Sequence, residues 1–329
     1  MDRRPGVCSR AMTELQRYLA EEIAIDHRDG HLTRREALRR LALLGVGAIA
    51  GTAMLSAACT PQPSENPGPV HSGVASSGGT SGAAGGDGGS PAPSGVVTPP
   101  AVATAGITFA GPEGRKLMGA WAAPTSGAPR GAVLVIHENK GLTAHIENVA
   151  GRFAHARYAA LAIDLLSEEG GTPSLGDPAN ATAALGKVAP ERFVADMKAG
   201  LDELARRAPG VKLAAIGFCF GGGMTWRLVA SKDPRLAAAA PFYGPLPDAV
   251  DFGGSKAAVL GVYAEKDARV NASRETAKAA LDKAGLVSEI VTYPGVDHAF
   301  HNDTGPRYDA NASAQAWTKV LDWFAKHVG

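Results

Sequence analysis

One cysteine stands among glycines where this 329-residue chain passes from an apolar stretch to a helical one. Cys219 is the centre of the segment GFCFG at 217–221, which follows the apolar stretch 211–216 and precedes the helical stretch 224–230. A nucleophile with small residues two positions away on either side, between strand and helix, is the nucleophile-elbow pattern with Cys in place of Ser. The N-terminus of the following helix favours a thiolate. The alternative interpretation is a glycine-rich turn with a structural Cys.

Two residues further along the chain supply an acid and a base. Asp267 follows the apolar stretch 257–263, and His298 lies in the loop between 289–293 and the last helical stretch. An Asp after a strand is usually a surface residue, and a loop His is usually solvated. However, α/β-hydrolases carry nucleophile, acid and base in this chain order, each just past a strand. The pattern therefore predicts a triad of Cys219, Asp267 and His298.

From about Ala105 to Gly329 the sequence resembles the dienelactone hydrolase (carboxymethylenebutenolidase-like) family of α/β-hydrolases. Besides the three triad residues, the resemblance rests on the segments VIHENKGL at 135–142 and HAFHNDTGPRY at 298–308. It implies hydrolysis of a small ester or lactone through a cysteine thioester, with neither cofactor nor metal. It also implies that Glu138 lies beside the nucleophile and controls its protonation, although an ordinary loop carboxylate remains the alternative.

Further site residues follow from the elbow and from the family pattern. The oxyanion is expected to bind the backbone N–H groups of Phe220 and Asn139. Tyr243 either lines the substrate pocket or caps the core. Glu168 and Asn302 occupy the places where well-known members carry two arginines for a substrate carboxylate. We therefore expect a less anionic substrate, unless Arg307 or Lys140 restores the positive charge.

Two other function classes are compatible with the sequence. An acyl or thiol transferase would use the same Cys219 with an acceptor other than water. A non-catalytic, tethered binding protein would keep only the fold, and the intact triad argues against it. Composition narrows the partners: a net charge of +1 gives no reason to expect nucleic acid or an anionic membrane surface. The cysteines at 8, 59 and 219 form no disulfide framework.

The first 59 residues are predicted to be an export signal. Arg34 and Arg35 resemble a twin-arginine motif read by the matching export machinery, and the apolar stretch 41–58 follows them. This stretch ends in LSAAC, which resembles a lipobox, so Cys59 is either lipidated or adjacent to a simple cleavage site. The expected location is periplasmic or cell-surface, with membrane anchoring if Cys59 carries lipid. Met12 is an alternative start.

The remaining chain divides into a linker and one domain. Residues 60–104 are rich in Gly, Ser and Pro and are predicted to be a disordered tether. Residues 105–329 alternate strand-like and helical stretches. This alternation predicts an α/β-hydrolase fold: an open, mostly parallel sheet of about eight strands with helices on both faces. Strands are expected at 106–110, 116–123, 132–137, 159–164, 212–217, 237–243, 257–263 and 289–293, and helices at 14–25, 146–156, 190–207, 222–230, 274–284 and 309–328.

Overall fold

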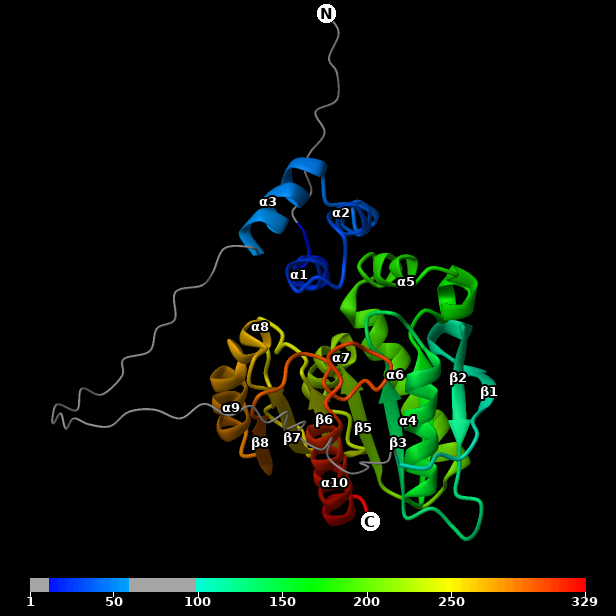
Figure 1. The fold of residues 1–329 in the computed structure, drawn as a ribbon. Helices are drawn as coiled ribbons and strands as arrows, with labels where there is room; N and C mark the ends of the chain where they lie inside the picture. The colour runs from blue at the N-terminus through cyan, green and yellow to red at the C-terminus, as the bar shows by residue number, and fades with distance from the viewer. Residues whose placement is uncertain (1–11, 59–98) are drawn as a thin grey trace, which may run out of the picture.

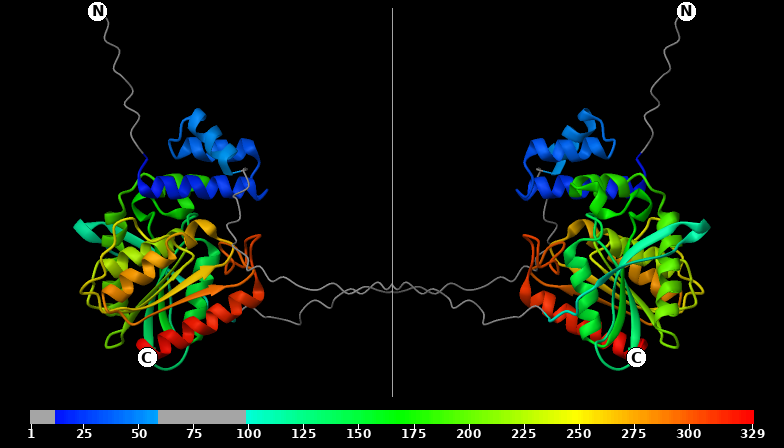
Figure 2. Two further views of the ribbon diagram at one scale, coloured as in Figure 1. Left: turned by 90° about the vertical axis from the view of Figure 1, so that its left-hand side faces the viewer. Right: turned by 90° about the vertical axis from the view of Figure 1, so that its right-hand side faces the viewer.

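The computed structural model describes residues 12–58 and 99–329 (Figure 1). Cys8, Cys59 and most of the predicted tether lie outside the described residues. The described chain forms a sheet with helices around it and a separate layer of three helices over the carboxyl ends of the strands (Figures 1 and 2). The prediction of an α/β-hydrolase fold is confirmed.

The sheet has eight strands in the order β1-β2-β4-β3-β5-β6-β7-β8. β1 and β2 pair antiparallel, β2 also pairs antiparallel with β4, and the pairs from β4 to β8 are parallel. The strands are β1 (Ala105–Ala110), β2 (Lys116–Ala122), β3 (Gly131–Ile136), β4 (Tyr158–Asp164), β5 (Leu213–Phe218), β6 (Leu236–Phe242), β7 (Ala258–Ala264) and β8 (Ser288–Tyr293).

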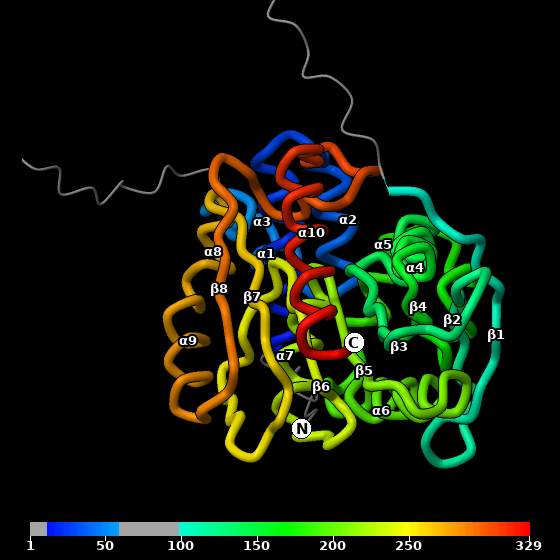
Figure 3. Tube along the Cα trace, turned by 90° about the horizontal axis from the view of Figure 1, so that it is seen from below, coloured from blue at the N-terminus to red at the C-terminus, as the bar shows by residue number. Residues whose placement is uncertain are grey.

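Helices cover both faces of the sheet (Figure 3). The chain moves one way along the sheet from β3 to β4 and the other way from β4 to β8, so right-handed crossovers place the connecting helices on opposite faces. α4 and α10 share one face, where Phe153 lies 4.6 Å from Trp317 between ring centroids. The helices of this domain are α4 (Ala144–His155), α5 (Pro178–Leu185), α6 (Pro190–Arg207), α7 (Phe220–Ala230), α8 (Ala268–Asn271), α9 (Arg274–Lys283) and α10 (Ala310–His327).

The central strands show why the chain folds in this way. Every residue of β3, β4, β5 and β7 is buried. Parallel strands covered on both faces must be apolar throughout, because neither face meets water. The carboxyl ends of these strands share one edge of the sheet, and the loops that carry Glu138, Cys219 and Asp267 leave from it.

The N-terminal layer consists of α1 (Glu14–Arg28), α2 (Arg34–Leu43) and α3 (Ala48–Ala58). Thr13 and Thr33 cap the first two helices through their side-chain oxygens. The apolar stretch 41–58 is not continuous, because the chain turns at Gly45, whose φ of 85° favours glycine. Among the described residues, none of the helices has the length and apolar character needed to cross a membrane.

Candidate active site

Cys219 sits on a strained turn between β5 and α7. Its φ of 57° and ψ of −118° are unusual for a residue with a side chain. A Cβ on Gly217 would lie 2.1 Å from the carbonyl oxygen of Gly221, and one on Gly221 would lie 2.4 Å from that of Ile136. A side chain at either glycine would therefore collide with neighbouring backbone.

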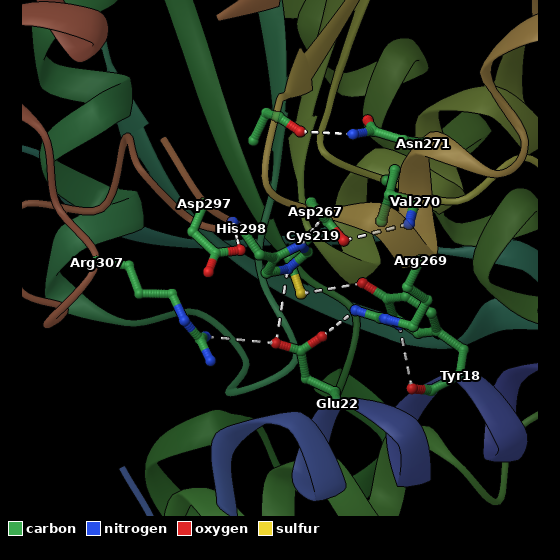
Figure 4. Close-up of polar contacts among 12 residues, drawn as sticks. Tyr18, Glu22, Cys219, Asp267, Arg269, Val270, Asn271, Asp297, His298 and Arg307 are labelled. Carbon is green, nitrogen blue, oxygen red and sulfur yellow. Dashed lines mark hydrogen bonds and ion pairs between the residues drawn. The ribbon is translucent and has the colours of Figure 1, made fainter. Parts of the chain in front are cut away.

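The predicted acid and base meet beside the nucleophile (Figure 4). Nδ1 of His298 lies 2.6 Å from Oδ2 of Asp267. A ring nitrogen of His298 lies within 4.8 Å of the Cys219 sulfur. Asp267 also caps α8 by accepting a hydrogen bond from the N–H of Val270. Burial alone would raise the pKa of Asp267, but the adjacent His298 outweighs burial and lowers it.

Glu138 follows β3 and borders the same cavity as Cys219 and Asn139, a cavity of about 290 Å³. It accepts a hydrogen bond of 2.5 Å from the side-chain amide of Asn302, while its other carboxylate oxygen has no hydrogen-bond partner within residues 12–58 and 99–329. The family pattern has a substrate-binding arginine at position 302. In this chain the position is Asn302, and its side chain binds Glu138.

The loop that carries His298 is fastened to α4. Asp303 accepts a hydrogen bond from Arg152, and its other carboxylate oxygen lies 2.7 Å from Nδ1 of His145. Asn302 precedes Asp303 and in turn accepts from the N–H and the hydroxyl of Thr304. The loop is thereby fixed at the point from which it reaches Glu138.

The other predicted residues take up different positions. Phe220 opens α7, where backbone N–H groups lack partners within the helix, and Asn139 lines the cavity near Cys219. Tyr243 is fully buried with its ring 5.1 Å from that of His298, so it packs beneath the base. Arg307 lines the cavity. Glu168 pairs with Arg115 and Arg192 and does not line it.

Two site residues come from α1, which sequence reasoning had assigned to an export signal. The hydroxyl of Tyr18 lies 3.3 Å from the Cys219 sulfur, and Oε1 of Glu22 lies 3.7 Å from Nε2 of His298 (Figure 4). Arg269 binds Glu22 and lies over the Tyr18 ring, 4.3 Å from its centroid. The helical spacing at 14–25 predicted the helix, but nothing in one sequence indicated where it docks.

Burial and charge together set the protonation of this group. Burial alone would lower the pKa of His298, but the carboxylates of Glu22 and Asp267 raise it well above its usual value. Burial alone would raise the pKa of Glu22, yet His298 and Arg269 lower it. Burial, followed by the adjacent Cys219, raises the pKa of Tyr18 well above its usual value. The arrangement favours an imidazolium between two carboxylates and a neutral phenol.

Glu22, Cys219 and His298 also form a group in which one sulfur, one nitrogen and one oxygen atom lie within 4.8 Å of one another. Such a donor set suits Zn²⁺, and Asp267 would support the histidine from behind. No metal was expected from the sequence.

The profile of the Dienelactone hydrolase family matches residues 117–328. This chain belongs to that family. Proteins provisionally named carboxymethylenebutenolidase are 32% identical over 252 residues in Salmonella typhi (72% of this chain, 93% of the relative) and 31% identical over 223 residues in Methylorubrum extorquens (63% and 75%). These relatives support an ester or lactone hydrolase.

Solved structures show the same relationship. A protein from Klebsiella pneumoniae provisionally named dienelactone hydrolase is 30% identical, with a TM-score of 0.60, and the match covers 69% of this chain and 100% of that one. A dienelactone-hydrolase-like promiscuous phosphotriesterase from metagenomic libraries is 25% identical, with a TM-score of 0.61 and the same coverage. The match in each case leaves nearly a third of this chain uncovered.

Proposed function

We propose that the protein hydrolyses small esters or lactones through a thioester on Cys219. The observation that carries this proposal is the elbow cysteine beside a histidine that is hydrogen-bonded to a buried aspartate. This arrangement matches the roles of nucleophile, base and orienting acid in acyl transfer.

The reaction would run in two halves. The sulfur of Cys219 attacks the carbonyl carbon, and the thiol proton passes to Nε2 of His298 or to Glu138. The C–O bond of the ester then breaks, and the alkoxide leaves as the alcohol after taking up that proton. In the second half, neutral His298 takes a proton from water, the hydroxide attacks the thioester, and the acid leaves with the thiol restored. Backbone N–H groups of Phe220 and Asn139 would bind the oxyanion.

We propose a small neutral ester or lactone as the substrate. Asn302 and Glu168 offer no positive charge, and Arg307, which lines the cavity, is already paired with Asp26 and Asp29 at 2.9 Å each. The test is kcat/KM for one lactone with and without a carboxylate, on the wild type and on Arg307→Ala. A strong preference for the carboxylate form would overturn the proposal, and its loss in Arg307→Ala would identify Arg307 as the receptor.

The mechanism is tested by mass spectrometry after incubation with activated esters. We expect an acyl adduct on Cys219 that turns over to free acid. Turnover only after addition of a thiol or alcohol acceptor would indicate a transferase. The absence of any adduct would indicate a binding protein.

We also propose that residues 1–59 direct export through the twin-arginine pathway. Arg34 and Arg35 are both exposed at the start of α2, which suits recognition by export machinery. Replacing both with Lys is expected to leave the precursor in the cytoplasm, as followed by fractionation. Cys59→Ala is expected to release the mature domain from membranes, and a mature N-terminus without lipid would rule out the anchor.

A further inference from the structure

Four residues of α1 form a single stripe that faces the catalytic domain. Glu14, Tyr18, Glu22 and Asp26 are spaced by four, which puts them on one side of a helix. Their partners in the catalytic domain are respectively Arg227, Cys219, Arg269 and Arg307. The stripe offers three carboxylates to three arginines, so the two surfaces are complementary in charge.

The two central residues of the stripe, Tyr18 and Glu22, lie against the reacting groups of the site. Cys219 and His298 are each only 3% exposed. The Tyr18 hydroxyl lies against the sulfur that must attack, and Glu22 faces Nε2, the nitrogen that must exchange protons with thiol and water. A carboxylate held at that nitrogen stands where the thiol or water must lie to exchange a proton with it.

The helix also divides the entrance to the site. One cavity of about 540 Å³ lies on the side of α3 and α8, and the cavity of about 290 Å³ lies on the side of Asn139 and Arg307. Glu22 and His298 border both. α1 therefore crosses the space directly above the catalytic base, where an acyl group on Cys219 would be attacked by water.

We propose that α1 is an internal inhibitor of this enzyme, and that the face carrying Cys219, Arg269 and Arg307 is its docking surface. The inference rests on the proposed function, because it concerns access to the same nucleophile. The chain stays latent while residues 14–58 remain docked. Removal of the segment during export would expose the nucleophile, so that hydrolysis begins only after the enzyme has left the cytoplasm.

A role for α1 as part of the working site is the competing interpretation. Asp267 already orients His298 through Nδ1, so a second carboxylate at Nε2 adds no orientation that the triad lacks. Arg269 and Arg307 are likewise already paired with carboxylates of α1, which leaves less of their positive charge for a substrate. Both facts favour inhibition, and the two interpretations predict opposite changes in activity.

A glycine remote from the triad allows α1 to be displaced without altering the site. A Cβ on Gly186, which follows α5, would lie 2.7 Å from Leu44 and 3.5 Å from Leu19 of the N-terminal layer. A full glutamate side chain there should force the layer away. Gly186→Glu is therefore the test variant, and Lys187→Glu, at the neighbouring exposed position, is the matched control.

Two readouts are taken on the full chain. The first is the rate at which iodoacetamide alkylates Cys219, followed by peptide mass spectrometry so that the other cysteines do not contribute. The second is kcat/KM for p-nitrophenyl acetate. If the site is open less than a tenth of the time, both should rise about tenfold or more in Gly186→Glu, because the apparent constants scale with the open fraction. Lys187→Glu should match the wild type.

The outcomes separate the two proposals. Faster alkylation with lower hydrolysis would overturn inhibition and make α1 part of the catalytic site. Unchanged rates in a folded Gly186→Glu would also overturn it, while hydrolysis by the wild type would leave the proposed function standing. Faster alkylation of Cys219 in Gly186→Glu, with no hydrolysis by the wild type or by any variant, would support docking of α1 over the nucleophile and refute the proposed function. If Gly186→Glu does not fold, the double variant Tyr18→Phe/Glu22→Gln decides by the same readouts.

Discussion

The catalytic domain and the N-terminal layer are held in place by different forces. The sheet is built on fully buried strands such as β3 and β5, with large aromatic side chains such as Phe153 and Phe218 fully buried around it. Helix α1 also buries Leu15 and Leu19, but the contacts that hold it over the reacting groups are ion pairs, the Tyr18 hydroxyl on the Cys219 sulfur and the Arg269 guanidinium over the Tyr18 ring. Apolar burial is hard to undo locally, but a charged interface responds to pH, salt and single substitutions.

The charged interface is sensitive because its groups are shielded from water. The side chains of Glu22, Arg307 and Arg269 are only 6%, 11% and 15% exposed. Removing one partner of a buried ion pair leaves the other charge uncompensated and typically costs about 3–5 kcal/mol. If α1 is an internal inhibitor, a few of its residues control whether the layer stays docked.

The largest expected effect is on the side of the catalytic domain. Cys219→Ala should reduce ester hydrolysis by roughly three decades or more, because the members of a nucleophile unit act together. The unfolding temperature should change little, because the substitution removes only one heavy atom, the sulfur. His298→Ala should give a comparable loss. Activity near that of the wild type on p-nitrophenyl acetate would refute the assignment of the nucleophile.

The next effect tests the rigidity of the elbow. In Gly221→Ala the new Cβ would lie 2.4 Å from the carbonyl of Ile136 and 2.5 Å from that of His137. Neither backbone group can move without distorting its strand or loop. The overpacking should therefore lower the free energy of unfolding by about 1–3 kcal/mol and lower the unfolding temperature. Gly223→Ala on the same helix is the control, since its nearest neighbour would be Pro245 at 3.4 Å. Equal unfolding temperatures for the two variants would contradict the steric argument.

A smaller effect is expected where Asn302 holds Glu138. Asn302→Ala removes a hydrogen bond to a buried carboxylate, a contact worth about 1.5–3 kcal/mol. If Glu138 takes part in proton transfer, Asn302→Ala should lower kcat by up to about two decades and change KM little. Pre-steady-state acylation rates would show the loss directly. A change confined to KM would mean that Asn302 serves substrate binding instead.

The smallest expected effect is a shift in pH dependence. The raised pKa of His298 means that its proton stabilises the docked state fully below the ordinary value of about 6.5, and that this contribution is lost as pH rises through the raised pKa. The lowered pKa of Glu22 stabilises docking above its ordinary value, with loss as pH falls through the lowered one. Docking should therefore weaken on the alkaline side.

Glu22→Gln should move the acidic limb of the pH profile of kcat/KM to lower pH, because His298 loses one of its two carboxylates. Arg17→Gln is the control on the exposed side of the same helix. Identical limbs in Glu22→Gln and the wild type would mean that Glu22 does not govern the proton on His298.

Periodicity and motif order were enough to predict the catalytic domain. All eight expected strands are present within one or two residues, and the helix at 190–207 has the expected bounds. Short elements were missed: α5 and α8 are too brief for a periodic signal, and the apolar stretch predicted at 41–58 covers the end of α2 and all of α3. Local pattern does not reveal that the chain turns at Gly45.

The site was predictable only where chain order carries information. Cys219, Asp267 and His298 stand in the order that the fold imposes, so three weak signals combine. Tyr18 and Glu22 lie about two hundred residues or more before their partners Cys219 and His298. Their contacts depend on how the amphipathic helix α1 docks on the folded catalytic domain. That is a tertiary event, and a single sequence holds no record of it.

The four-residue spacing of the stripe on α1 makes its contacts depend on the number of residues in the helix. Each residue of a helix advances by about 100°, so one residue inserted between Tyr18 and Glu22 would turn Glu22 and Asp26 away from Arg269 and Arg307, while Glu14 and Tyr18 kept their partners. A deletion there would do the same in the opposite direction. A substitution on this helix therefore affects one contact, whereas a change in its length breaks two at once, and relatives that share the docking should keep the number of residues between these positions.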